Sequence, residues 1–152
     1  MAASATLAAI SLAPGLASAT AAPTSGKVEV KVATVGKYGK ILEDQAGLAL
    51  YYDTAVKPPS HWACKGSCLT AWPPLVLPKG QKAPTVASGV TGISTVKGPS
   101  GVQVTWHGKP LYTFIRDKAG QVNGQGVGGV WYVTQLSAAA TTKTKTTSGY
   151  GY

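Results

Sequence analysis

The sequence contains few charged residues. Aspartate, glutamate, lysine and arginine make up 12% of its 152 residues, against about a quarter in typical soluble domains. Long surface helices need charged faces, so this composition excludes a coiled coil or a helical array. The 19 glycines and 10 prolines favour loops and strands, and the four tryptophans exclude a fully disordered chain. The length fits one domain, or one small domain with tails.

Groups that carry out catalysis are also scarce. Only five acidic side chains and two histidines are present. Glu43 and Asp44 are adjacent at a predicted hairpin, where solvated carboxylates are more common than a catalytic dyad. A serine nucleophile with His107 and Asp117 has no support from spacing, since no G-x-S-x-G motif occurs. The glycines at 124–129 also lack the strand–loop–helix order of a nucleotide-binding loop. We therefore expect that the protein is not an enzyme.

Acidic residues are outnumbered by lysines, which gives a formal net charge of +9. The lysines are scattered from Lys27 to Lys145. Arg116 alone offers the guanidinium that pairs bidentately with phosphates or base edges, so specific nucleic-acid binding is not expected. The pattern favours a basic surface that associates with anionic cell-wall polymers or glycans and is weakened by salt.

Long apolar runs are absent after the first 22 residues, so no transmembrane anchor is predicted. Residues 1–22 resemble a signal-peptide leader, and Ala17-Ser18-Ala19 has the small-x-small pattern that a signal peptidase recognises. No basic residue precedes the apolar stretch, so we expect the true start to lie upstream. A disordered alanine-rich tail is the alternative. The leader predicts an exported protein, secreted or on the cell surface.

Cys64 and Cys68 are the only cysteines. In an exported protein an even count predicts a disulfide, and Gly66 gives the short loop between them the freedom to close. Closing so small a ring stabilises a fold by about 2 kcal/mol. We expect the bond to brace the loop locally rather than to hold the whole domain.

Alternation of apolar and polar residues predicts a β domain over 27–136. Val28, Val30 and Val32 fall on one face of a strand within 27–35. The other expected elements are antiparallel strands at 41–43, 48–52, 90–96, 102–106, 111–115 and 130–134, and one helical turn at 67–72 that Pro73 and Pro74 end.

An internal repeat divides this domain. The motif G-x-x-L-Y occurs at Gly47–Tyr51 and again at Gly108–Tyr112, 61 residues later. We expect two related β units, at about 27–88 and 89–136, packed on a shared core. The segment 137–152 has no apolar face to bury and is expected to be a disordered tail.

The stretch Tyr112-x-Phe114-x-x-Asp117 places two aromatic rings on one strand face and an acid at the strand's end. Such an acid typically accepts backbone N–H groups and fixes the next loop, and a carboxylate offered to a cation is the alternative. With the preceding Gly108-x-Pro110-Leu111, this stretch closely resembles the bacterial secreted-repeat lipoproteins marked by a Y-x-[FWY]-x-x-D motif.

Three other segments agree with this resemblance and extend it over about residues 35–136. They are the hairpin at 39–51, the block Cys64-x3-Cys68-x3-Trp72-Pro73-Pro74-Leu75, and Gly124-Gln-Gly126 leading to Trp131-Tyr132. The chain departs from the family in two places, since Asp53 follows Tyr51 by two positions instead of five and the lipid-attachment cysteine is missing. The resemblance implies an exported β-rich domain and assigns no reaction.

The aromatic residues are expected to form the core, because each buries a large area. The alternative is a surface of exposed rings that stacks on the sugars of wall glycan. Tyr51 and Tyr52 point to opposite faces of their strand, so one of them is the better candidate for exposure. The set comprises Trp62, Trp72, Trp106, Trp131, Tyr51, Tyr52, Tyr112 and Tyr132.

His61, Cys64 and Cys68 form an alternative site, which His107 could join from the other half. Imidazole and thiolate ligands suit Cu(I) or zinc. However, C-x3-C is not the spacing of zinc knuckles, and Met1 is the only methionine, unlike the methionine-rich copper carriers. We expect no metal or cofactor, with copper binding or thiol redox chemistry at the cysteine pair as the alternative.

These features predict an exported, non-enzymatic cell-surface or matrix domain, with a binding or structural role, that contacts envelope polymers. The residues that carry the family motif are Tyr51, Trp72, Pro73, Pro74, Tyr112, Phe114 and Asp117.

Overall fold

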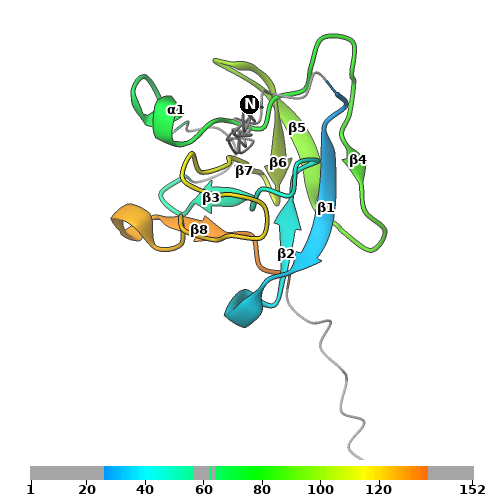
Figure 1. Ribbon diagram of the computed structural model, residues 1–152. Coiled ribbons are helices and arrows are strands. Elements are labelled where there is room, and N and C mark those ends of the chain that lie inside the picture. The colour runs from blue at the N-terminus through cyan, green and yellow to red at the C-terminus, as the bar shows by residue number, and fades with distance from the viewer. Residues whose placement is uncertain (1–25, 57–61, 63, 137–152) are drawn as a thin grey trace, which may run out of the picture.

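The computed structural model describes residues 26–56, 62 and 64–136. The predicted leader at 1–22, His61 and the predicted tail at 137–152 lie outside the described residues. The described part is mostly β with little helix, as the sequence predicts (Figure 1). Its elements are β1 (Glu29–Thr34), η1 (Gly36–Tyr38), β2 (Lys40–Glu43), β3 (Tyr51–Asp53), α1 (Cys68–Ala71), β4 (Thr85–Val86), β5 (Ile93–Gly98), β6 (Gly101–Trp106), β7 (Lys109–Pro110), η2 (Val127–Gly129) and β8 (Trp131–Val133).

The first sheet has the order β2-β1-β4. Val28 and Val30 are buried and Val32 is partly buried, which confirms the face predicted from their alternation. β1 pairs antiparallel with β2 but parallel with β4. This parallel pairing departs from the expected antiparallel arrangement. It is short, because β4 has two residues and lies in a stretch without strand-like alternation.

Two further sheets complete the described fold. β5, β6 and β7 form an antiparallel meander in that order. β3 pairs antiparallel with β8, so segments far apart in the sequence run side by side (Figure 1). The predicted helical turn is α1, which ends at Trp72 immediately before Pro73 and Pro74.

The hairpin of the first repeat takes its third strand from the second repeat. Leu50 N–H donates to Leu42 O at 2.9 Å, Leu42 N–H donates to Thr134 O at 3.1 Å, and Thr134 N–H donates back to Leu50 O at 2.9 Å. Thr134 follows directly after β8. The first hairpin is therefore completed by a segment from the far end of the domain.

The second hairpin is completed in the same way by the first half. Leu111 N–H donates to Val104 O at 2.9 Å, Val104 N–H donates to Leu75 O at 2.9 Å, and Leu75 N–H donates to Leu111 O at 3.0 Å. Tyr51 and Tyr112 exchange two backbone hydrogen bonds, of 2.8 and 3.0 Å, where the repeats meet. The two repeats thus make equivalent hydrogen bonds, since each hairpin pairs with one segment from the other repeat.

Two apolar clusters lie under these shared strands. One is aliphatic and includes Val30, Leu42, Leu50, Val104 and Leu111. The other is aromatic and consists of Ile41, Ala49, Tyr51, Cys64, Trp72, Tyr112, Phe114, Trp131 and Val133. Both clusters draw on both repeats, so the exchanged strands pack on a shared core.

Candidate functional site

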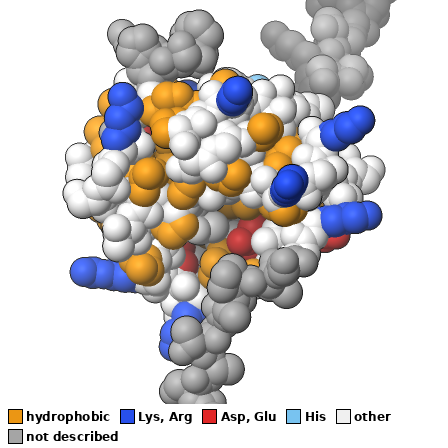
Figure 2. Space-filling view, turned by 90° about the horizontal axis from the view of Figure 1, so that it is seen from above, with side chains coloured by type: hydrophobic (Ala, Val, Ile, Leu, Met, Phe, Trp, Pro, Cys, Tyr) orange, Lys and Arg blue, Asp and Glu red, His pale blue; other side chains and the backbone are white. Residues whose placement is uncertain are grey.

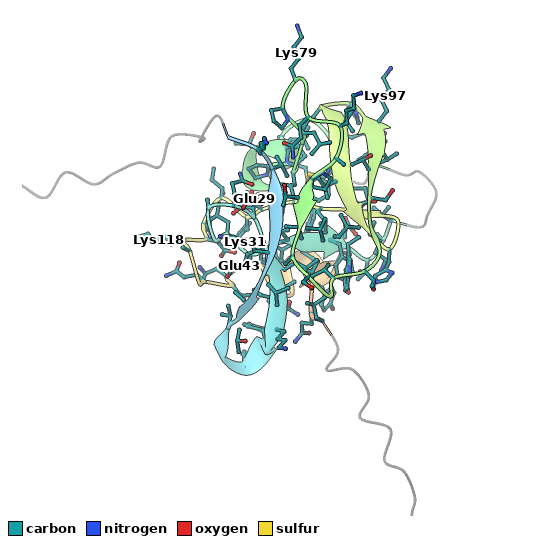
Figure 3. The ribbon with its side chains drawn as sticks, turned by 90° about the vertical axis from the view of Figure 1, so that its right-hand side faces the viewer. Glu29, Lys31, Glu43, Lys79, Lys97 and Lys118 are labelled. Carbon is teal, nitrogen blue, oxygen red and sulfur yellow. A yellow bond between two sulfur atoms is a disulfide. The ribbon has the colours of Figure 1, made fainter. Side chains whose placement is uncertain are left out.

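Most of the acidic side chains are withdrawn from the surface. Glu43, Asp44, Asp53 and Asp117 are 8%, 5%, 6% and 8% exposed, and the fifth acid, Glu29, is half-buried. The exposed charged residues of the described part are all basic: Lys27, Lys37, Lys40, Lys65, Lys79, Lys82, Lys97, Arg116 and Lys118. Figure 3 shows Lys79, Lys97 and Lys118 extending away from the domain, and Figure 2 shows basic side chains spread around one face.

The expectation that Glu43 and Asp44 are solvated is wrong, because both side chains are buried. Asp44 Oδ1 accepts the N–H groups of Ala46 and Leu48, each at 2.9 Å, and so holds the turn between β2 and β3. Burial raises the pKa of Asp44, against the lowering effect of these N–H groups. Burial also raises the pKa of Glu43, which stands opposite Lys31 in the β1–β2 register.

Asp117 joins the two repeats. Its Oδ2 accepts the Tyr51 hydroxyl at 2.6 Å, and its Oδ1 accepts Asn123 N–H at 2.8 Å. Gly124 N–H donates to the same Tyr51 hydroxyl at 3.2 Å. Burial and the Asp117 carboxylate raise the pKa of Tyr51. The acid that ends the family motif thus fixes the loop that follows it, and both of its oxygens are engaged within the fold.

Three other residues of the family motif lie in the interior. Trp72, Tyr112 and Phe114 are 4%, 1% and 8% exposed. Pro73 O accepts Thr113 N–H at 2.9 Å, and Pro74 forms a bridge with Tyr112, so both prolines sit on the strand that crosses between repeats. Trp72, Tyr112 and Phe114 therefore assemble the core and offer no surface for a ligand, whereas Pro73 and Pro74 are half-buried.

A second group of aromatic rings is partly exposed. Tyr52 is half-buried, whereas its neighbour Tyr51 is fully buried. The Tyr52 ring centroid lies 6.0 Å from that of Trp106, and Lys109 Nζ lies 4.4 Å from it. Trp106 in turn contacts the His107 ring edge-on at 4.8 Å between centroids. These rings remain available to a stacking ligand, unlike those of the motif.

Cys64 and Cys68 form a disulfide, with their Cα atoms 5.3 Å apart. Both sulfurs of the alternative metal site are therefore bonded to each other, and His61 lies outside the described residues. Within the described ranges, no group of three or more His, Cys, Asp or Glu side chains is arranged to hold a metal. The copper or thiol-redox alternative stays a prediction for the reduced protein.

His107 lies at a different place, in an open cleft of about 700 Å³. We call it the Trp106 cleft. It is lined by Val32 and Lys40 from the first sheet, the loop 88–91 between β4 and β5, Trp106 and His107 from the β6–β7 turn, and Gln135 and Leu136 after β8. The loop 88–91 lies at the lower right of Figure 1.

The backbone and the imidazole ring of His107 are packed closely against Gly92. Its backbone adopts φ +48°, in the left-handed region that non-glycine residues rarely adopt. His107 N–H donates to Gly92 O at 2.8 Å, and a Cβ atom at Gly92 would lie 2.5 Å from the imidazole ring. Gly92 thus leaves the space that the imidazole occupies beside the cleft.

The sequence singles out His107 and Trp106 but does not predict the cleft. Lys40, Val90 and Gln135 come from segments far apart in the sequence, and no local spacing connects them. The basic composition pointed to anionic partners, but it could not distinguish Lys40 from the other exposed lysines.

Comparison with known proteins identifies one family. No curated protein and no solved structure matches this chain. Among the described residues, no helix is both long and apolar enough to span a membrane. Residues 94–135, which include the second hairpin and β8, match a family described as a secreted repeat of unknown function. Over residues 94–135, the match agrees with the resemblance predicted from the sequence.

Proposed function

We propose that this protein is an exported, non-enzymatic domain that binds anionic polymers of the cell envelope through its basic surface. The observation that carries the proposal is the separation of charges. Four of the five acids are buried, whereas the exposed charged residues of the described part are all basic. A polyanion that approaches this domain meets cations with almost no acidic group to repel it.

The scattered lysines favour a polymer over a compact ligand. Lys79 and Lys97 extend from one end of the fold and Lys118 from another side (Figure 3), so no single small anion can contact all three. A long polyanion can contact several in turn, each weakly. Such binding is sensitive to salt because exposed charges are screened within about 10 Å at moderate ionic strength.

The use of the carboxylates supports binding rather than catalysis. Asp44, Asp53 and Asp117 accept N–H groups of their own loops, from Ala46, Ala55 and Asn123, at 2.7 to 2.9 Å. Carboxylates engaged in this way stabilise turns. They are poorly placed to transfer protons to a substrate.

Co-sedimentation with purified peptidoglycan carrying anionic wall polymers tests the proposal. We expect retention at low salt that falls steeply when salt is raised. A triple variant with Lys79, Lys97 and Lys118 changed to Gln should bind more weakly, and the matched triple change to Arg should bind like the wild type because it keeps the charge. Absence of retention at low salt, or retention that salt does not alter, would overturn the proposal.

A further inference from the structure

The Trp106 cleft combines the features of a small-ligand site. Its volume of about 700 Å³ lies within the usual range of about 300–1,000 Å³ for ligand pockets. Apolar side chains line part of it, and Lys40, His107 and Gln135 add polar groups at its edge. A few polar groups around an apolar surface are the usual means of fixing a ligand's orientation.

The described lining of the cleft carries positive charge and no negative charge. Lys40 is exposed and is the one charged residue among the described residues that line it. No acidic side chain of the described part belongs to this lining. The cleft therefore favours a ligand that carries a negative charge.

The indole of Trp106 supplies an independent observation. Its Nε1 is buried and has no hydrogen-bond partner within the described part of the chain. A buried donor without a partner costs free energy, and native proteins rarely leave one unpaired. An acceptor oxygen that a ligand brought to Nε1 would remove this cost.

We propose that the Trp106 cleft binds an anionic saccharide unit. A sugar ring has an apolar face that packs on an aromatic or aliphatic side chain, and its hydroxyl and carboxyl oxygens accept hydrogen bonds. The carboxylate pairs with Lys40, and the ring packs between Trp106 and the side chains of Val90 and Leu136. This inference rests on the proposed function, since it names the unit of the envelope polymer that is recognised.

Calorimetric titration with two disaccharides tests the inference. The first is N-acetylglucosaminyl-N-acetylmuramic acid, which carries a lactyl carboxylate, and the second is the uncharged di-N-acetylchitobiose. We expect the first to bind at least about tenfold more tightly, because a charge-assisted hydrogen bond to Lys40 is lost in the second. Binding of the first should also shift the indole N–H resonance of Trp106, assigned with Trp106→Phe.

Two lysine variants separate the cleft from the general surface charge. Lys40→Gln should weaken binding of the acidic disaccharide about tenfold. Lys97→Gln removes the same charge at the end of the β5–β6 hairpin that lies far from Trp106. Lys97 pairs with Val102 next to the turn, whereas Trp106 pairs with Ile93 at the opposite end of the hairpin. This variant should leave the affinity for the disaccharide within about twofold of the wild type.

A pair of glycine variants tests the place of His107. Gly92→Ala puts a methyl group 2.5 Å from the imidazole, whereas Gly120→Ala, at nearly the same φ and outside the lining of the cleft, meets nothing within 4 Å. Gly92→Ala should therefore reduce disaccharide binding more than Gly120→Ala. Equal losses would show that His107 does not shape the site.

The outcomes distinguish the two proposals. If wall polymers are retained in a salt-sensitive manner but neither disaccharide binds, the proposed function stands and the saccharide site is overturned. Equal binding of both disaccharides, or equal effects of Lys40→Gln and Lys97→Gln, also overturns it. Failure of retention on the polymers overturns the proposed function itself.

Discussion

Trp72 and Trp131 stack face to face, with ring centroids 3.9 Å apart and planes inclined by 9°. Trp72 lies three residues before Leu75, which completes the hairpin of the second repeat. Trp131 lies three residues before Thr134, which completes the hairpin of the first repeat. The stack therefore joins the starts of the two crossing strands. The stability of the domain and the exchange of strands between the repeats therefore depend on the same contacts.

Gly124→Ala should disturb this stack. The new Cβ would lie 2.8 Å from the Trp72 ring and 2.9 Å from the Tyr51 ring. Overpacking of a core typically costs about 1–3 kcal/mol. We expect a lower free energy of unfolding in urea and an altered near-ultraviolet circular dichroism spectrum. Gly126→Ala, where a Cβ meets nothing within 4 Å, should leave the spectrum unchanged; a change as large as that of Gly124→Ala would contradict the assignment.

Tyr51→Phe should destabilise the domain by about 1–3 kcal/mol, because a buried carboxylate loses a donor. The hydroxyl lies 2.6 Å from Asp117 Oδ2 and also accepts Gly124 N–H. Tyr132→Phe is the matched control, since its hydroxyl makes one long contact of 3.5 Å to Gly129 O at the surface. Urea unfolding of the two variants measures the difference. Equal stabilities would show that the Tyr51–Asp117 bond adds nothing to the fold.

The alternation of Val28, Val30 and Val32 was enough to predict β1, and Asp44 and Gly47 were enough to predict the turn after β2. Local patterns of this kind report which face of a strand is buried. They do not report its partner, so the pairing of β3 with β8 and the crossing strands at Leu75 and Thr134 were not predicted.

The candidate site was less accessible to prediction. Asp117 was correctly expected to fix its loop, since Asx turns are local. Its bond to Tyr51 spans 66 residues, and the Trp106 cleft gathers Lys40, Trp106 and Gln135 from three distant segments. Such contacts follow from tertiary packing, which sequence spacing does not encode locally.

Removal of the disulfide should weaken the domain without unfolding it. The double change of Cys64 and Cys68 to Ala opens a ring that closes only five residues, a constraint equivalent to about 2 kcal/mol. Cys64 belongs to the aromatic cluster, but the other eight members of that cluster and the whole aliphatic cluster lie outside the ring. We expect a native circular dichroism spectrum and a lower urea midpoint. Intact mass of the wild type should lack two hydrogens, and a fully reduced native protein would contradict the bond.

Mild acid should stabilise the domain through Glu43 and Asp44. Burial raises the pKa of both carboxyls above their ordinary values of 4.5 and 3.8, so the folded state binds more protons than the unfolded state between the ordinary and the raised values. Their contribution to the free energy of unfolding is therefore fully present below the ordinary values and is lost as pH rises through the raised ones. Urea unfolding at intervals from about pH 7 down to the ordinary values measures it.

Glu43→Gln should reduce this gain on acidification, because the variant has no proton to bind at that position. Lys31→Met should enlarge it, since Lys31 attracts the Glu43 carboxylate and lowers its pKa. The two variants thus change the pH slope in opposite directions, which a general loss of stability cannot do. A wild-type slope in both variants would show that Glu43 is not the group responsible.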